Sequence, residues 1–220
     1  MTVNFGIICE GPTDFVTLKH ILNGYFAEQS PKIRCLQPSL DASDKTLKGH
    51  HGNWTHVLHY VESDFFHEAF NYLDYIIIQI DTDVCQEPFF NVSTRNKNGE
   101  DLSETELYDC VSINIIDRIT NSKKGNDIFE NYSNKIIFCI CIHSLECWLL
   151  AHYDPKNRTQ SCENHLARYI SQKLPTIKYS KESSVYAQLS KPFLKIANIT
   201  SAVEHSKSFS IFINSLTSVI

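Results

Sequence analysis

Hydrophobic residues in this chain form short runs separated by stretches of helical periodicity. Four runs predict β-strands, at residues 3–9, 33–37, 75–80 and 135–143. The third and fourth runs are rich in isoleucine and almost free of polar residues, which is typical of strands buried on both faces of a parallel sheet. The sequence therefore predicts a sheet that is covered on both sides.

Between these runs, apolar residues recur at intervals of three and four. They predict a helix from about Pro12 to Glu28, another over 54–69 and another over 107–119, and only helices follow Glu163. Alternating strands and helices indicate an α/β fold. We expect a doubly wound, mainly parallel four-stranded sheet with helices on both faces and a helical C-terminal extension.

The division of charge supports two parts, a catalytic domain at 1–155 and a basic helical extension at 156–220 packed on it. Residues 156–220 hold nine Lys and Arg against three Asp and Glu, a balance of +6, so the net charge of −5 leaves −11 for residues 1–155. This asymmetry suggests that the acidic part binds metal and the basic part contacts phosphate. Lysines on solvated helix faces are the ordinary alternative.

Two polar segments are predicted to be loops. Residues 41–53 include Lys45, Lys48, His50 and His51, and are predicted to be a solvated loop, with phosphate binding as the alternative. Residues 84–100 contain only Phe89 and Phe90 as strong anchors. Such a long connection is either a lid or binding loop or simply disordered.

Acidic residues follow three of the four predicted strands. Glu10 follows the first, Asp81 and Asp83 the third, and Glu146 the fourth. Ligands of doubly wound sheets bind beyond the carboxyl ends of the strands, and Asp81 and Asp83 point to the same side because they are two residues apart. Two close carboxylates need a proton or a cation. A hard divalent ion, Mg²⁺ or Mn²⁺, fits oxygen ligands.

Five short motifs carry a resemblance to a known family. They are Glu10-Gly11-x-x-Asp14, Asp81-x-Asp83, His143-Ser144-Leu145-Glu146-x-Trp148-Leu149-Leu150, Tyr179-Ser180-Lys181 and Ser208-Phe209-x-x-Phe212. The first two resemble the Toprim domain of primases, topoisomerases and small nucleases. The whole succession is similar to small stand-alone bacterial Toprim-like proteins and to the nuclease domains of overcoming-lysogenization-defect proteins.

The resemblance implies a divalent-metal-dependent nuclease that hydrolyses DNA or RNA, as an effector of a bacterial defence system. It implies metal ligands at Glu10, Asp14, Asp81, Asp83 and Glu146. Glu10 would ligate the metal or act as general acid or base. Lys181 would neutralise the phosphate, with Lys178 and Lys191 as the less favoured candidates. Related proteins are often encoded beside an ATPase, so a partner ATPase and a second copy of the chain are the expected protein partners.

Several of these residues have structural alternatives. Asp14 could cap a helix and complement its dipole, and Glu146 could be an exposed residue in a first helical turn. His143 is expected to be a hydrogen-bonded histidine at a strand end, although His143 and Ser144 are close enough in sequence to reach the same sheet edge.

Two other functions stay open. A hydrophobic run ending in Asp-x-Asp also opens phosphatases of the haloacid-dehalogenase type, where the first Asp is a nucleophile, but Glu10 would then have no role. Nucleotide-sugar transferases use a similar motif, and this chain is short for them. A net charge of −5 predicts weak binding to nucleic acid, which also favours a regulatory module that works with a partner.

The remaining composition indicates an ordinary cytoplasmic protein. No apolar run approaches the roughly 20 residues of a membrane span, and no signal peptide is apparent. Eight cysteines are expected to be reduced thiols, with Cys9, Cys139, Cys141 and Cys147 packed in apolar runs. No CxxC pair points to zinc, and no Gly-rich loop with lysine points to ATP.

Overall fold

The four predicted strands form one parallel sheet in the computed structural model, which describes residues 2–38, 54–123 and 125–219. The strands are β1 (Asn4–Ile8), β2 (Lys32–Gln37), β3 (Tyr75–Asp81) and β4 (Ile136–Cys141), in the order β2-β1-β3-β4. The predicted α/β class, with helices on both faces, is confirmed. The predicted loop at 41–53 lies outside the described residues.

Alternation along the strands creates two separate cores. Phe5, Ile7 and Ile77 belong to the core on one face, whereas Ile76 and Ile78 belong to the core on the other. All five side chains are fully buried. This is the expected result for isoleucine-rich strands covered on both sides.

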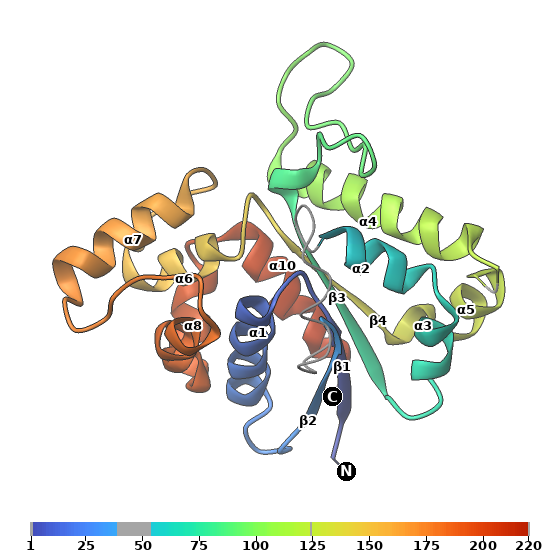
Figure 1. The fold of residues 1–220 in the computed structure, drawn as a ribbon, viewed down its shortest axis with the longest axis horizontal. Coiled ribbons are helices and arrows are strands. Elements are labelled where there is room, and N and C mark those ends of the chain that lie inside the picture. Colours follow the sequence, from blue (N-terminus) through green and yellow to red (C-terminus); the bar gives the residue numbers. More distant parts are fainter. Residues whose placement is uncertain (1, 39–53, 124, 220) are drawn as a thin grey trace.

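The helices divide between the two faces (Figure 1). One face carries α1 (Pro12–Tyr25), α6 (Glu146–Tyr153), α7 (Cys162–Lys173), α8 (Ser183–Ser190), α9 (Ile196–Val203) and α10 (Lys207–Ser215), with the 3-10 turns η4 (Lys191–Leu194) and η5 (Leu216–Val219). The other carries α2 (Trp54–Val61), α3 (Asp64–Ala69), α4 (Glu104–Asn121) and α5 (Gly125–Tyr132). Two short turns, η2 (Thr82–Val84) and η3 (Ser133–Lys135), flank β3 and β4.

The C-terminal helices share the core of the sheet. Leu166, Tyr186 and Phe212 lie in the same buried cluster as Phe5 and Ile77. Helix α1 packs against α8, α9 and η4. Residues after 156 therefore form part of the wall on one side of the sheet.

Three sequence expectations need correction. The helix predicted at 54–69 is two helices, because the chain turns at 62–63 and Ser63 becomes the N-cap residue of α3. Helix α5 was not predicted. Cys147 and Cys162 form a disulfide, so the expectation of reduced thiols is wrong for both of them. The packing of α6 on α7 brings together two cysteines that are 15 residues apart, and the sequence alone does not show this.

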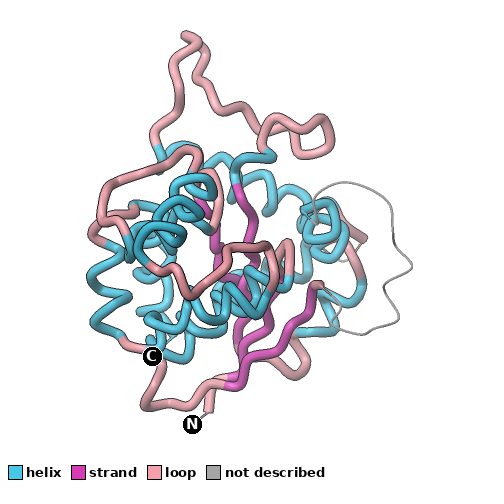
Figure 2. The backbone as a smooth tube through the Cα atoms, turned by 60° about the vertical axis from the view of Figure 1, so that its left-hand side comes forward, coloured by secondary structure: helices cyan, strands magenta, loops and turns pink. Residues whose placement is uncertain are grey.

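The segment after β3 projects as a long irregular loop (Figures 1 and 2). Phe90 anchors its base, fully buried, with its ring edge-on to Trp54 at 5.9 Å between centroids. An antiparallel bridge joins Arg95 to Asp101. The loop ends at Ser103, which caps α4 in a capping box with Glu106. Among the described helices, none has the length and apolarity that a membrane span requires.

Candidate functional site

The carboxyl ends of β1 and β3 are joined by a buried polar link. The Asp81 N–H donates to Glu10 Oε1 at 2.7 Å, and the Glu10 N–H donates to Gln79 Oε1 at 3.1 Å. The Gln79 amide in turn donates to Asp81 Oδ1 at 2.9 Å. The chain runs from β1 to β2 on one side and returns to β3 on the other, so β1 and β3 flank the point where ligands bind in such sheets.

Glu10 and Asp14 lie close enough to the other acids to repel them. Burial, followed by the charge of Asp14, raises the pKa of Glu10 to about 8, against the hydrogen bond from the Asp81 N–H. Burial and the charge of Glu146 raise the pKa of Asp14 to about 7. Asp14 lies in the first turn of α1, after the N-cap residue Gly11, and interactions with the N–H groups of Gly11 and Asp14 oppose the rise of its pKa.

Asp81, the last residue of β3, and Asp83, two residues further on, also interact with these acids. Burial raises the pKa of Asp81 well above its ordinary value, and repulsion from Glu10 adds to the effect. Burial also raises the pKa of Asp83, against the attraction of His143, while Glu146 repels it. Asp81 is half-buried and Asp83 is exposed. The acids of three strand ends therefore form one electrostatic group, called the acid cluster below: Glu10, Asp14, Asp81, Asp83 and Glu146.

Glu146 is held by two tyrosines from the C-terminal part of the chain. The Tyr186 hydroxyl donates to Glu146 Oε1 at 2.5 Å, and the Tyr179 hydroxyl lies 3.1 Å from that of Tyr186. Glu146 is 8% exposed and Tyr186 is 1% exposed. The predicted alternative of an exposed first-turn residue is therefore wrong for Glu146.

Replacing Tyr186 by Phe should destabilise the protein by about 1–3 kcal/mol, because the buried Glu146 carboxylate loses a hydrogen-bond donor that water does not replace. Denaturant unfolding measures this change. Tyr179→Phe is the control, and its effect should be smaller because Tyr179 reaches Glu146 only through Tyr186. Equal stability of the Tyr186→Phe protein and the wild type would show that this hydrogen bond does not support the site.

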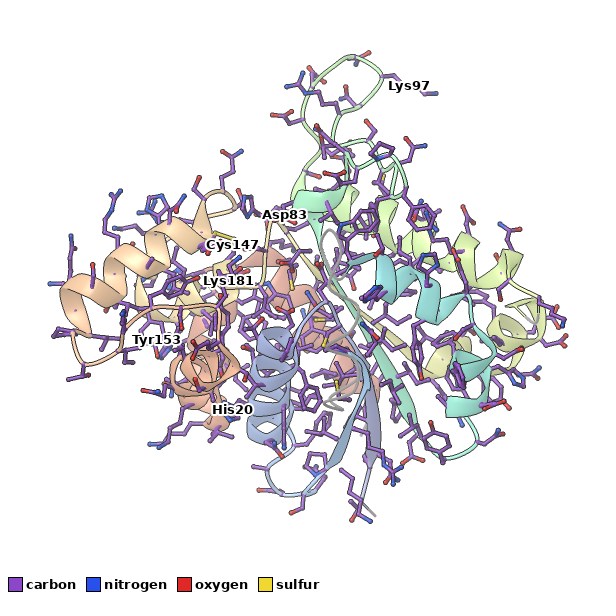
Figure 3. The ribbon with its side chains drawn as sticks, viewed as in Figure 1. His20, Asp83, Lys97, Cys147, Tyr153 and Lys181 are labelled. Atoms are coloured by element: carbon purple, nitrogen blue, oxygen red, sulfur yellow. A yellow bond between two sulfur atoms is a disulfide. The ribbon has the colours of Figure 1, made fainter. Side chains whose placement is uncertain are left out.

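Among the described lysines, Lys181 is one whose charge reaches the acid cluster. Its ammonium forms an ion pair with Glu163 Oε2 at 2.8 Å, and its charge acts on Asp14 and Asp83. Burial opposes its charge, but the hydrogen bond to Glu163 and the charge of Glu146 raise the pKa of Lys181 overall. Asp83 and Lys181 are labelled in Figure 3. Lys191 lies instead beside His20 on α1.

His143 connects the ends of β3 and β4 through its backbone. Its N–H donates to Thr82 Oγ1 at 2.7 Å, and its carbonyl accepts from the Asp83 N–H at 3.1 Å. A φ of 64° places His143 in the left-handed region, which is uncommon for histidine. Among the residues that the structure describes, its buried Nδ1 and the Ser144 Oγ have no hydrogen-bond partner. The expectation of a satisfied histidine is therefore wrong for Nδ1.

Sequence reasoning missed three residues of the site: Gln79, Glu163 and Tyr186. Gln79 has a signal, because it is the one polar residue inside the run Ile76–Ile80 and buried polar groups need partners. Glu163 and Tyr186 have no such signal in the sequence. Their contacts with Lys181 and Glu146 arise only when α7 and α8 pack beside α6 and α1. Of the predicted residues, the structure groups all five acids and places Lys181 beside them.

The acid cluster fits a hard divalent cation by its donor set, since it offers carboxylate oxygens in excess over nearby positive charge. Within the described residues, no group of three or more His, Cys, Asp or Glu side chains is positioned to hold a metal ion. Glu10 and Glu146 instead accept the protein hydrogen bonds given above. Mg²⁺ commonly uses one or two carboxylates together with waters and substrate phosphate, so a complete protein cage is not required.

Comparison of this chain with family models, with curated proteins and with solved structures gave no match. The case for its function therefore depends on the geometry of the site.

Proposed function

We propose that this protein is a divalent-cation-dependent nuclease that hydrolyses phosphodiester bonds at the acid cluster. The contact between Glu10 Oε1 and the Asp81 N–H, at 2.7 Å, is the observation that carries the proposal. It brings acids from two separated strand ends together at the ligand-binding edge of the sheet. Close carboxylates at such a place repel one another, and a bound cation would relieve this repulsion.

Asp81 and Asp83, with Glu10 and Glu146, are the side chains that would hold Mg²⁺ or Mn²⁺, and Asp14 would support them from outside. When bound, the cation would neutralise the charge of the phosphate and activate a water molecule. The resemblance to Toprim nucleases noted from the sequence points to the same reaction, and it belongs to this proposal.

The side chains of the chain supply proton transfer and charge. In the metal-free protein the pKa of about 8 lets Glu10 accept and release protons near neutral pH, which would suit it to general acid–base catalysis where it is not itself a metal ligand. Lys181 would neutralise the scissile phosphate. Its present partner does not prevent this, because the side chains of Lys181 and Glu163 are 61% and 42% exposed and such surface pairs contribute only about 0–1 kcal/mol.

A nuclease explains Glu10, whereas a phosphatase of the haloacid-dehalogenase type assigns it no role. The net charge of −5 remains unfavourable for binding free nucleic acid. We therefore include in the proposal a protein partner, an ATPase, that delivers the substrate. A regulatory module without catalysis is the alternative that the following experiment separates.

The test is cleavage of labelled DNA and RNA by the purified protein in Mg²⁺ or Mn²⁺, with a chelator control. The wild type should cut in either ion, whereas Glu10→Ala should not cut while keeping the wild-type circular dichroism spectrum. Full activity in Glu10→Ala would contradict the proposal. Absence of both cleavage and calorimetric Mn²⁺ binding in the wild type would favour the regulatory module, and rapid hydrolysis of a small phosphomonoester would favour the phosphatase.

A further inference from the structure

A groove of about 530 Å³ opens beside the acid cluster. Thr82, Asp83 and His143 form its inner end, the projecting loop contributes residues from Gln86 to Leu102, and residues 159–161 form the opposite wall. Its size is within the range of roughly 300–1,000 Å³ for small-molecule sites. The groove therefore begins where the proposed reaction takes place.

The charged side chains of the groove are all acidic. Asp83, Asp101 and Glu104 line it, and within the described residues no lysine or arginine does. Leu102, Leu107 and Ile142 provide apolar surface between polar groups. A phosphate backbone would be repelled here, whereas an uncharged ring with hydrogen-bonding edges would find both apolar contact and polar partners.

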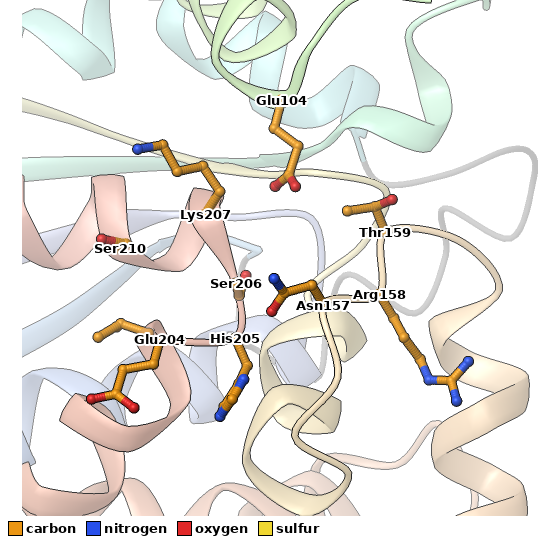
Figure 4. A pocket seen from close by; sticks show the side chains of 10 residues that line it. Glu104, Asn157, Arg158, Thr159, Glu204, His205, Ser206, Lys207 and Ser210 are labelled. Atoms are coloured by element: carbon orange, nitrogen blue, oxygen red, sulfur yellow. The ribbon is translucent and has the colours of Figure 1, made fainter.

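A smaller cavity of about 200 Å³ adjoins the groove and shares Glu104 and Thr159 with it. It contains basic residues, but in Figure 4 the guanidinium of Arg158 and the ammonium of Lys207 extend away from Glu104, Asn157 and Ser206. The Glu104 carboxylate also accepts a hydrogen bond from the backbone N–H of Ser208. The charge of Lys207 does reach the shared Glu104 and opposes the rise of its pKa, but Lys207 does not line the groove itself.

We propose that the groove binds one unpaired nucleoside next to the scissile phosphate, so that the substrate is single-stranded nucleic acid or an unpaired region of a duplex. This inference rests on the proposed function. With the phosphate at the acid cluster, the adjoining nucleoside lies toward Asp83 and His143, at the inner end of the groove. A base within a duplex is stacked and paired, and must leave the stack to enter a concave site.

The test uses a variant that fills the groove from its exposed wall. Gln160 lines the groove and is exposed, so Gln160→Trp should narrow it without disturbing the core. Gln172→Trp is the matched control, because Gln172 is also exposed and lies near the other end of α7. Each protein is titrated against a fluorescent single-stranded oligonucleotide and the same sequence as a blunt duplex. Fluorescence anisotropy reports binding, and cleavage in Mn²⁺ gives KM and kcat.

The wild type and Gln172→Trp should prefer the single strand to the duplex by about tenfold or more in affinity, as expected when one base gains a contact surface. Gln160→Trp should lose this preference, mainly through KM. Equal use of both substrates by the wild type, or equal behaviour of the two Trp variants, would overturn the inference and leave the nuclease intact. Absence of both cleavage and calorimetric Mn²⁺ binding in the wild type would remove the proposed function, and this inference with it.

Discussion

Asp81→Asn should make the metal-free protein more stable and remove its cleavage of nucleic acid. The Asp81 carboxylate is half-buried, and burial with repulsion from Glu10 raises its pKa well above the ordinary value. Asn removes the charge. It also keeps an oxygen that can accept the hydrogen bond from Gln79, so the fold should be preserved.

The gain in stability should depend on pH. A carboxyl with a raised pKa binds its proton more tightly in the folded state, so its contribution to stability is greatest below the unfolded pKa of about 4 and is lost as pH rises through the folded pKa. Asn does not titrate. The difference in Tm between Asp81→Asn and the wild type should therefore grow from pH 5 to pH 8.

Thermal unfolding in chelator at the two pH values measures this difference. Removing a pKa shift of one unit changes the free energy of unfolding by about 1.4 kcal/mol. In a protein of this size, that corresponds to a change in Tm of about 3–5 °C. Asp109→Asn on the exposed side of α4 is the control and should change neither stability nor cleavage. A lower Tm for Asp81→Asn at pH 8 would show that Asp81 is a structural acid with a stabilising partner.

Gly24→Ala should destabilise the protein by roughly 3 kcal/mol. Gly24 lies in α1 where the helix meets η4, and a Cβ there would lie 1.9 Å from the carbonyl oxygen of Phe193. Backbone atoms cannot move aside as a side-chain end can. The better helix propensity of alanine, about 1 kcal/mol, is too small to offset this overlap.

This substitution also tests whether the C-terminal helices hold the site. Separation of η4 and α8 from α1 would move Tyr186 away from the strand ends that carry Glu10 and Asp81. Gly24→Ala should thus show a Tm lower by about 6–12 °C, whereas Lys19→Ala, exposed on the same helix, should unfold like the wild type. A wild-type Tm for Gly24→Ala would mean that α1 and η4 are not in close contact.

Much of the fold could be predicted from the sequence because the strands at 75–81 and 136–141 are almost pure apolar runs, and a parallel sheet must place their ends at one edge. The proximity of Glu10 to Asp81 follows from the same rule. Contacts between distant helices could not be predicted. The disulfide between Cys147 and Cys162 and the hydrogen bond of Tyr186 to Glu146 depend on how α6, α7 and α8 pack, and no local pattern specifies this.

The groove beside Asp83 was also beyond prediction. The polar segment 84–100 gave no regular period, and its course is set by burial of Phe90 and by the cap of Ser103 on α4. The left-handed backbone at His143 likewise has no sequence signal, since histidine rarely adopts it.

The most direct measurement for the acid cluster is anomalous diffraction from crystals soaked in Mn²⁺. A Mn²⁺ peak in contact with a carboxylate oxygen of Asp81, and with Glu10 or Glu146 beside it, is the predicted result. Well-ordered density at this edge of the sheet with no Mn²⁺ peak would contradict the account.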